Sequence, residues 1–137
     1  MTELNQAVIN VIEEFFRLQG EFDGDGILNL WHTEGMVYMV GNNNQFRINS
    51  IKEQCAHINE VKKKVPDIRV DFLIDSVEEV SIQDDLIATA RVQWRMMMLD
   101  SYGKHRSFYN LVKIGGRWVI VNVVDRGLEI KGDGHNA

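Results

Sequence analysis

The chain has one cysteine, one proline and no apolar run long enough to cross a bilayer, among 137 residues. A lone thiol cannot form an intrachain disulfide, so the fold is not a disulfide scaffold. A membrane-spanning helix needs about 20 mostly apolar residues. Because the N-terminal stretch also lacks the pattern of a secretory signal, we expect a cytoplasmic protein without a membrane span.

Basic residues are in deficit, with 15 Lys and Arg against 20 Asp and Glu, and the formal net charge is −5. Such a field repels polyanions, so nucleic acid and anionic membranes are excluded as expected partners. Histidine is also scarce, and the four histidines show no H-x-H or H-x3-H spacing. We therefore expect no metal site and no cofactor.

The hydrophobic content of 45% is that of an ordinary globular domain. Apolar residues recur at helical spacing over residues 4–18 and 51–65, and a short helix is expected near 27–32. Ser50 and Glu53 have the capping-box spacing before the third helix, and Pro66 closes it. Residues 36–40 and 45–48 are expected to form a hairpin around an asparagine-rich turn.

From Ile68 onward the hydrophobic pattern has a period of two, which predicts long antiparallel strands. Helices in the first half and a strand meander in the second indicate an α+β fold, a curved, mixed sheet wrapped around N-terminal helices. We expect one domain over residues 1–127 and a frayed tail over 128–137.

Matching apolar residues across the turns predicts the register of these strands, because a slip by one residue reverses every side chain. The expected pairs place Trp94 opposite Tyr109, Met98 opposite His105, and Tyr109 opposite Asn122. The inner face then becomes polar toward one end. The outer face is expected to carry Arg91, Gln93, Arg95, Phe108, Asn110, Val112, Val119, Val121 and Val123.

Three segments resemble the nuclear transport factor two-like superfamily, most closely its lumazine-binding-like and polyketide-cyclase-like (SnoaL-like) bacterial members. They are Phe22-Asp23-Gly24-Asp25, Leu30-Trp31-His32, and residues 109–122 with the Gly115-Gly116 turn. The resemblance extends to about Gly127. It implies a cone-shaped domain with a pocket inside the curved sheet, and commonly a homodimer through the outer face of the sheet.

Enzymes of this superfamily place titratable groups inside the cone, and this sequence departs from their patterns. The lumazine-binding-like pattern commonly has an aspartate where this chain has Ser107. The Arg-x-Asp pair of the limonene epoxide hydrolase-like members is here Arg91-Val92-Gln93. Glutamine cannot accept a proton from water, so the resemblance does not by itself imply catalysis.

We interpret the chain as a small-molecule-binding domain whose ligand is planar and mostly apolar. The expected pocket residues are Trp94, Met96, Met98, His105, Ser107, Tyr109 and Asn122. One alternative is an isomerase, dehydratase or cyclase that uses His32 or His105 with Tyr109 as proton donor. A second alternative is an association module with a vestigial pocket. The apolar and arginine-rich outer face predicts a homodimer under each of these interpretations.

Overall fold

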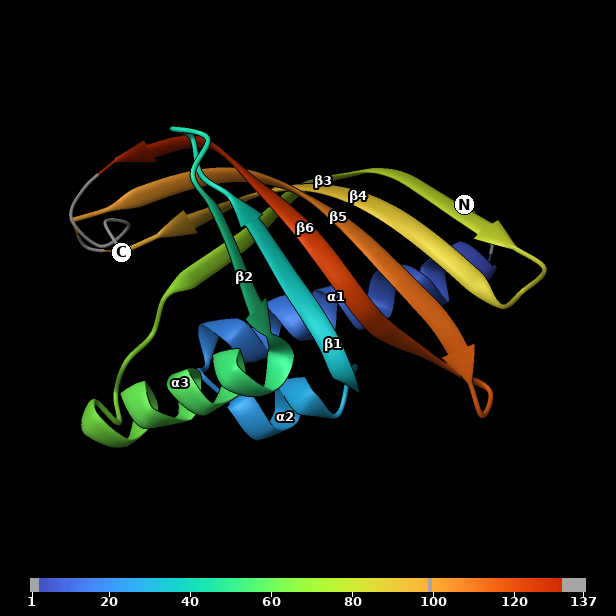
Figure 1. Ribbon diagram of the computed structural model, residues 1–137, viewed down its shortest axis with the longest axis horizontal. Helices are drawn as coiled ribbons and strands as arrows, with labels where there is room; N and C mark the ends of the chain where they lie inside the picture. Colours follow the sequence, from blue (N-terminus) through green and yellow to red (C-terminus); the bar gives the residue numbers. More distant parts are fainter. Residues whose placement is uncertain (1–2, 99, 132–137) are drawn as a thin grey trace.

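The computed structural model describes residues 3–98 and 100–131. Three helices and six strands follow one another as α1 (Glu3–Gly20), α2 (Gly24–Leu28), β1 (Trp31–Val40), β2 (Phe46–Ser50), α3 (Ile51–Lys64), β3 (Asp71–Gln83), β4 (Ile87–Met97), β5 (Tyr102–Ile114) and β6 (Arg117–Lys131). The sheet curves over the helices, with α1 crossing beneath it and α2 and α3 below one end (Figure 1). This is the expected α+β fold with a curved, mixed sheet.

The strands lie in the order β2-β1-β6-β5-β4-β3. Strands β3 to β6 form the expected antiparallel meander, β1 and β2 form the expected hairpin, and β1 runs parallel to β6. The expected helix over residues 27–32 is wrong beyond Leu28, because the Ile120 amide donates to the Leu30 carbonyl at 3.0 Å and draws Trp31 alongside β6.

The helices follow from local sequence signals. In α1, the residues at helical spacing that face the sheet include Val8, Ile12 and Phe15, all buried. At the start of α3 the Glu53 amide donates to Ser50 Oγ, and the Ser50 hydroxyl donates to Glu53 Oε1, which completes the capping box. No helix of the described residues is both long and apolar enough to cross a membrane.

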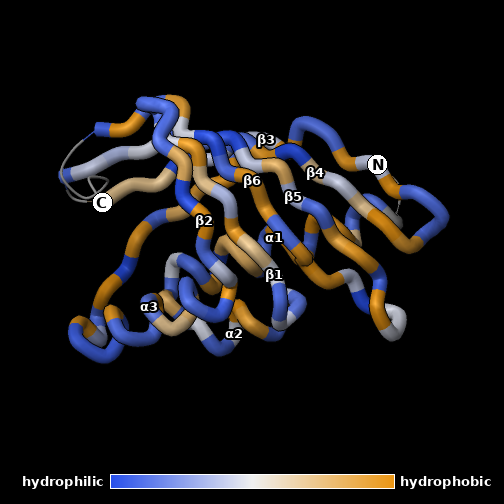
Figure 2. Tube along the Cα trace, viewed as in Figure 1, coloured by the Kyte–Doolittle hydropathy of each residue, from blue (hydrophilic) through white to orange (hydrophobic). Residues whose placement is uncertain are grey.

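The core lies where α1 packs under the meander. Its fully buried side chains include Ile12, Val92, Leu111 and Ile120. Figure 2 shows hydrophobic residues recurring along α1 and the long strands, whereas the tip of the β1–β2 hairpin is hydrophilic. The space between α1 and the meander is therefore filled by core side chains.

The register of β4 against β5 differs from the expected one by four residues. Trp94 pairs with His105, and Ala90 pairs with Tyr109, because the strands join through a turn that begins after Met97. An even shift leaves the inward-facing set of side chains unchanged. The predicted pairing of Trp94 with Tyr109 is wrong, but both still face inward.

The register of β5 against β6 is as expected from Ile114↔Arg117 to Leu111↔Ile120 and then changes. Val121 is an extra residue in β6, so Asn110 pairs with Asn122 and Tyr109 pairs with Val123. A bulge of one residue reverses the faces beyond it. Val123 is therefore inward and 5% exposed rather than on the outer face, and Asn122 lies outward.

Strand β6 continues to Lys131, past Gly127, where we expected the domain to end. Within the expected tail, residues 129–131 pair with β5. The rest of that expected tail, residues 132–137, lies outside the described residues.

Candidate ligand cavity and its buried carboxylate

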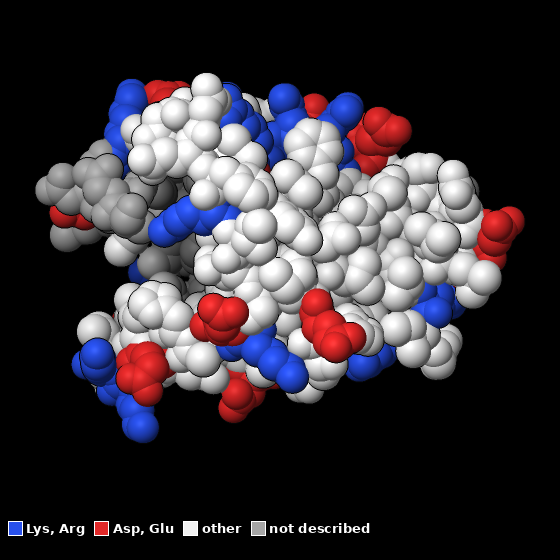
Figure 3. Space-filling view, viewed as in Figure 1, with Lys and Arg blue, Asp and Glu red and all other residues white. Residues whose placement is uncertain are grey.

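A cavity of about 1110 Å³ lies between the end of the sheet and α3. Its walls come from β1, β2, α3, the C-terminal end of α1, and the inner faces of β3 to β6. In the space-filling view the molecule is hollowed at its left end, between the β1–β2 hairpin and α3 (Figure 3). The part of the cone that the core leaves open is therefore large enough for a small organic molecule.

Three aromatic side chains of the core line the inner end of this cavity: Phe15, Trp94 and Tyr109. With Phe16 and Trp31, which belong to the same core, they form the aromatic cluster. Phe15 meets Trp31 edge to face with ring centroids 5.5 Å apart, and Phe16 meets Trp94 in the same way at 5.4 Å. Edge-to-face contacts of this kind stabilise beyond simple burial. The cluster is therefore the part of the core that borders the cavity.

A chain of hydrogen bonds crosses strands β4, β5 and β6 on the cavity wall. Trp94 Nε1 donates to Ser107 Oγ at 2.7 Å, and the Ser107 hydroxyl donates to Asp125 Oδ1 at 2.7 Å. The other carboxylate oxygen, Oδ2, lies 2.9 Å from His105 Nδ1. The Trp94 and His105 rings are stacked, with centroids 4.3 Å apart and planes 10° from parallel. The polar network thus consists of Trp94, Ser107, Asp125 and His105.

The network compensates the desolvation of a carboxylate that is largely removed from water. The Asp125 side chain is 15% exposed and that of His105 is 11% exposed. A carboxylate in such a place is costly unless donors satisfy both oxygens, and here the Ser107 hydroxyl and the His105 ring do so. The same bonds fix the orientation of the His105 ring relative to the cavity.

Tyr109 remains a neutral phenol in this setting. Burial raises the pKa of its hydroxyl far above the usual range, the negative charge of Asp125 raises it further, and a hydrogen bond with Ser107 opposes the shift. The phenol is therefore suited to donate a hydrogen bond and cannot act as a base near neutral pH.

The structure brings five of the seven expected pocket residues together on the cavity wall: Trp94, Met96, His105, Ser107 and Tyr109. Met98 is outside the cavity, because β4 ends at Met97 and the Met98 side chain is 39% exposed. Asn122 is also outside it, because the bulge at Val121 turns its side chain outward, where it accepts from Asn110 at 2.7 Å. Met98 and Asn122 therefore lie apart from the five cavity residues with which we expected them to contact a ligand.

His32 is likewise separate from this site. It lies in β1 rather than at a helix end, and its Nδ1 accepts from the Glu34 amide at 3.1 Å. Cys55 is fully buried in α3, and burial together with the charge of Asp25 raises the pKa of its thiol to about 11. Within residues 3–98 and 100–131, no three histidine, cysteine, aspartate or glutamate side chains are grouped to hold a metal ion.

Sequence reasoning missed Asp125, the residue on which the network converges. An uninterrupted alternation along β6 places Asp125 outside with Val123, and the only local sign of a break is the adjacent pair Val123 and Val124. It also missed the polar wall formed by the hairpin and α3, which includes Arg47, Asn49, Gln54 and His57. Where the resembled pattern commonly has an inward aspartate, this chain has Ser107, and the inward aspartate is Asp125, its cross-strand partner on β6.

We predict that Ser107→Ala lowers the free energy of unfolding by about 1 to 3 kcal/mol, because it leaves Trp94 Nε1 and Asp125 Oδ1 without their shared partner. Urea denaturation measures this change. Ser81→Ala, on exposed β3, is the matched control and should alter stability by less than about 0.5 kcal/mol. Equal stability of the two variants would contradict the role given to Ser107.

Comparisons with known proteins agree with this architecture. The model of the family described as "Putative lumazine-binding" matches residues 3–124. A search of curated proteins finds no match. Among solved structures, an NTF2-like protein of unknown function from Shewanella baltica is 16% identical, with a TM-score of 0.68, covering 97% of this chain and 99% of its own.

Two further solved structures carry names of enzymes. A "Putative Scytalone Dehydratase" from Novosphingobium aromaticivorans is 12% identical with a TM-score of 0.76, covering 97% of this chain and 92% of its own. A ketosteroid isomerase-like protein from Erwinia carotovora is 10% identical with a TM-score of 0.67, covering 94% and 99%. At such identities the likeness shows the fold alone. The fold is that of the NTF2-like solved structure, and the family model establishes that the chain belongs to the family described as "Putative lumazine-binding".

Proposed function

We propose that the protein binds a small, flat and mostly apolar molecule in the cavity beneath the sheet. The observation that carries the proposal is the cavity itself, about 1110 Å³ in volume, with an apolar and aromatic wall on the sheet side and a polar wall from the hairpin and α3. Small-molecule sites typically combine these two features. The family description points to the same class of partner.

The geometry defines which surfaces such a ligand meets. His105 covers one face of Trp94, so the ligand cannot stack on that face. Phe72, Met96 and Val123 supply apolar area on the sheet side of the cavity. The polar network is already internally bonded, so it orients the ligand and contributes less to affinity than the apolar walls do.

We predict that Val123→Phe fills the cavity and weakens ligand binding at least tenfold. Val123 is 5% exposed and lines the cavity, so the added ring enters the space that the ligand needs. The control is Val65→Phe, the same substitution at a site that is 50% exposed after α3. A thermal-shift screen of planar aromatic compounds identifies the probe, and titration calorimetry measures each variant.

If no planar compound stabilises the wild type, the proposal is overturned. It is also overturned if Val123→Phe, folded by circular dichroism, binds the hit as the wild type does.

The His105–Asp125 contact favours a second candidate function, proton transfer on the bound molecule. A carboxylate 2.9 Å from one ring nitrogen fixes the tautomer of a histidine, which is the arrangement of a general base and its orienting partner. The neutral Tyr109 phenol next to Ser107 supplies a hydrogen-bond donor. Two of the solved structures with this fold carry the names of such enzymes, ketosteroid isomerase-like protein and "Putative Scytalone Dehydratase", which is consistent with this candidate.

We predict that the wild type accelerates exchange of the acidic C–H protons of 2-tetralone in D2O, followed by proton NMR. His105→Gln should lower the rate by about 10² to 10⁴, the usual contribution of a positioned acid or base. His32→Gln, at a histidine of β1 that does not line the cavity, is the control and should retain the wild-type rate. Binding of the ketone without exchange would exclude this function.

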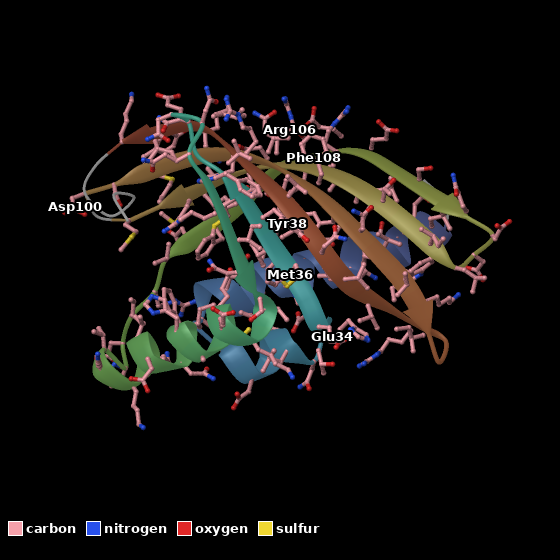
Figure 4. All side chains as sticks on the ribbon, viewed as in Figure 1. Glu34, Met36, Tyr38, Asp100, Arg106 and Phe108 are labelled. Atoms are coloured by element: carbon pink, nitrogen blue, oxygen red, sulfur yellow. The ribbon has the colours of Figure 1, made fainter. Side chains whose placement is uncertain are left out.

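We also propose a homodimer through the outer face of the sheet. One apolar row crosses β2, β1, β6 and β5 on this face. Its members are successive cross-strand partners: Ile48, Tyr38, Val124 and Phe108. Phe46 stacks on Tyr38, with centroids 6.4 Å apart, at one end of the row. Tyr38 and Phe108 can be followed on β1 and β5 in Figure 4. Of the outer-face residues expected to form the interface, Phe108 belongs to this row and Val123 does not.

Charges border the apolar row where β5 meets β4. Arg106 pairs with Glu78 at 2.9 Å, and Arg95 pairs with Asp75 at 2.8 Å. These ion pairs are satisfied within one chain, so they can remain at a solvated rim. An apolar row with a polar rim, meeting its own copy about a two-fold axis, is a self-complementary interface.

We predict that Val124→Glu shifts the mass measured by light scattering from dimer to monomer, because it buries a charge at the centre of the row. Ile114→Glu, at a 49% exposed site outside the row, should leave the mass unchanged. A monomeric wild type at high micromolar concentration would refute the dimer.

A further inference from the structure

Arg47 places a positive charge on the wall of the cavity. It lies on β2 opposite Met39, and Asn49 on the same strand lies opposite Val37. Met39 and Val37 both line the cavity, and cross-strand partners share a face of the sheet, so Arg47 and Asn49 face the cavity as well. Arg47 is exposed, which puts it at the mouth rather than at the inner end.

The two carboxylates on the wall, Asp125 and Glu53, have partners within the chain. The two oxygens of Asp125 interact with Ser107 and His105, and Glu53 Oε1 accepts from the Ser50 hydroxyl at 3.0 Å. His57 and Tyr109 also lie on this wall. In the described parts of the chain, the Arg47 guanidinium has no hydrogen bond or ion pair. A basic side chain is visible at the edge of the hollow in Figure 3.

A second polar group on the same wall also lacks a partner. Gln54 Oε1 is a buried acceptor that no described residue satisfies. Gln54 is in the first turns of α3, and β2 passes directly into α3 at Ser50, so Gln54 and Arg47 belong to adjoining walls. Buried acceptors without a donor are rare in folded proteins, so a donor from a bound molecule suits this position.

We infer that the ligand is a flat organic acid whose carboxylate pairs with Arg47 at the mouth, while a neighbouring O–H or N–H group donates to Gln54. This inference rests on the proposed ligand-binding function and adds the class of ligand. A guanidinium presents a planar fork that matches a carboxylate with two parallel hydrogen bonds. The charge of Asp125 repels a second anion, so the carboxylate stays at the mouth and the apolar body enters toward the aromatic cluster.

The test compares naphthalene-2-carboxylate with naphthalene-2-carboxamide, which share their ring system and differ in charge. Titration calorimetry on the wild type should show the acid binding about fivefold to tenfold more tightly than the amide. Added salt should reduce this preference, because exposed charges are screened.

Arg47→Met should abolish the preference and leave the affinity for the amide unchanged. Arg47→Lys keeps the charge without the planar fork and should give an intermediate preference. Arg117→Met is the matched control, because Arg117 is an exposed arginine at the β5–β6 turn, away from the cavity wall. The Arg117→Met variant should prefer the acid over the amide by the same factor as the wild type does.

The outcomes separate this inference from the function on which it rests. If acid and amide bind equally to the wild type, or if Arg47→Met retains the preference, the assignment of an acid is overturned while cavity binding stands. If neither compound binds at millimolar concentration and no other planar compound stabilises the protein, the proposed function fails too.

Discussion

The extra residue at Val121 is the constraint on which the site depends. Before it, Trp118 and Ile120 point toward the helices, and after it Val123 and Asp125 do. A strand without the bulge presents Asn122 and Val124 to the interior instead. The single insertion therefore puts a carboxylate inside the cone and leaves an apolar residue, Val124, at the centre of the outer row.

The buried carboxylate in turn organises the wall around it. Asp125 is bonded to a serine and a histidine that lie on β5, and that serine is bonded to a tryptophan on β4. Three neighbouring strands are thus joined through side chains as well as through their backbones. Such a network fixes ring orientations, which apolar packing alone leaves freer, and a site that positions a ligand needs fixed groups.

Local patterns in the sequence predict most of the fold and only part of the site. The capping box at Ser50, the two-residue turn at Gly115 and Gly116, and the strand alternation each depend on neighbouring residues, and all appear in the structure. The position of a turn within a long polar stretch and the presence of a bulge depend on contacts across the sheet. These contacts decide the places of Met98, Asn122 and Asp125, so a single sequence could not assign them.

Strand β2 passes directly into α3, and this connection makes the wall that the two elements give the cavity rigid. Ser50 ends the strand and caps the helix, and at the other side of α3 the Asn59 side chain bonds the Gly24 amide and the Asp25 carboxylate of α2. Gly24 lies so close to Asn59 that a Cβ there would stand 2.4 Å from Asn59 Oδ1. The β1–β2 hairpin, α3 and α2 are thus connected directly, and no loop separates β2 from α3. If the cavity binds a ligand as proposed, the fixed width of this entrance limits which molecules can enter.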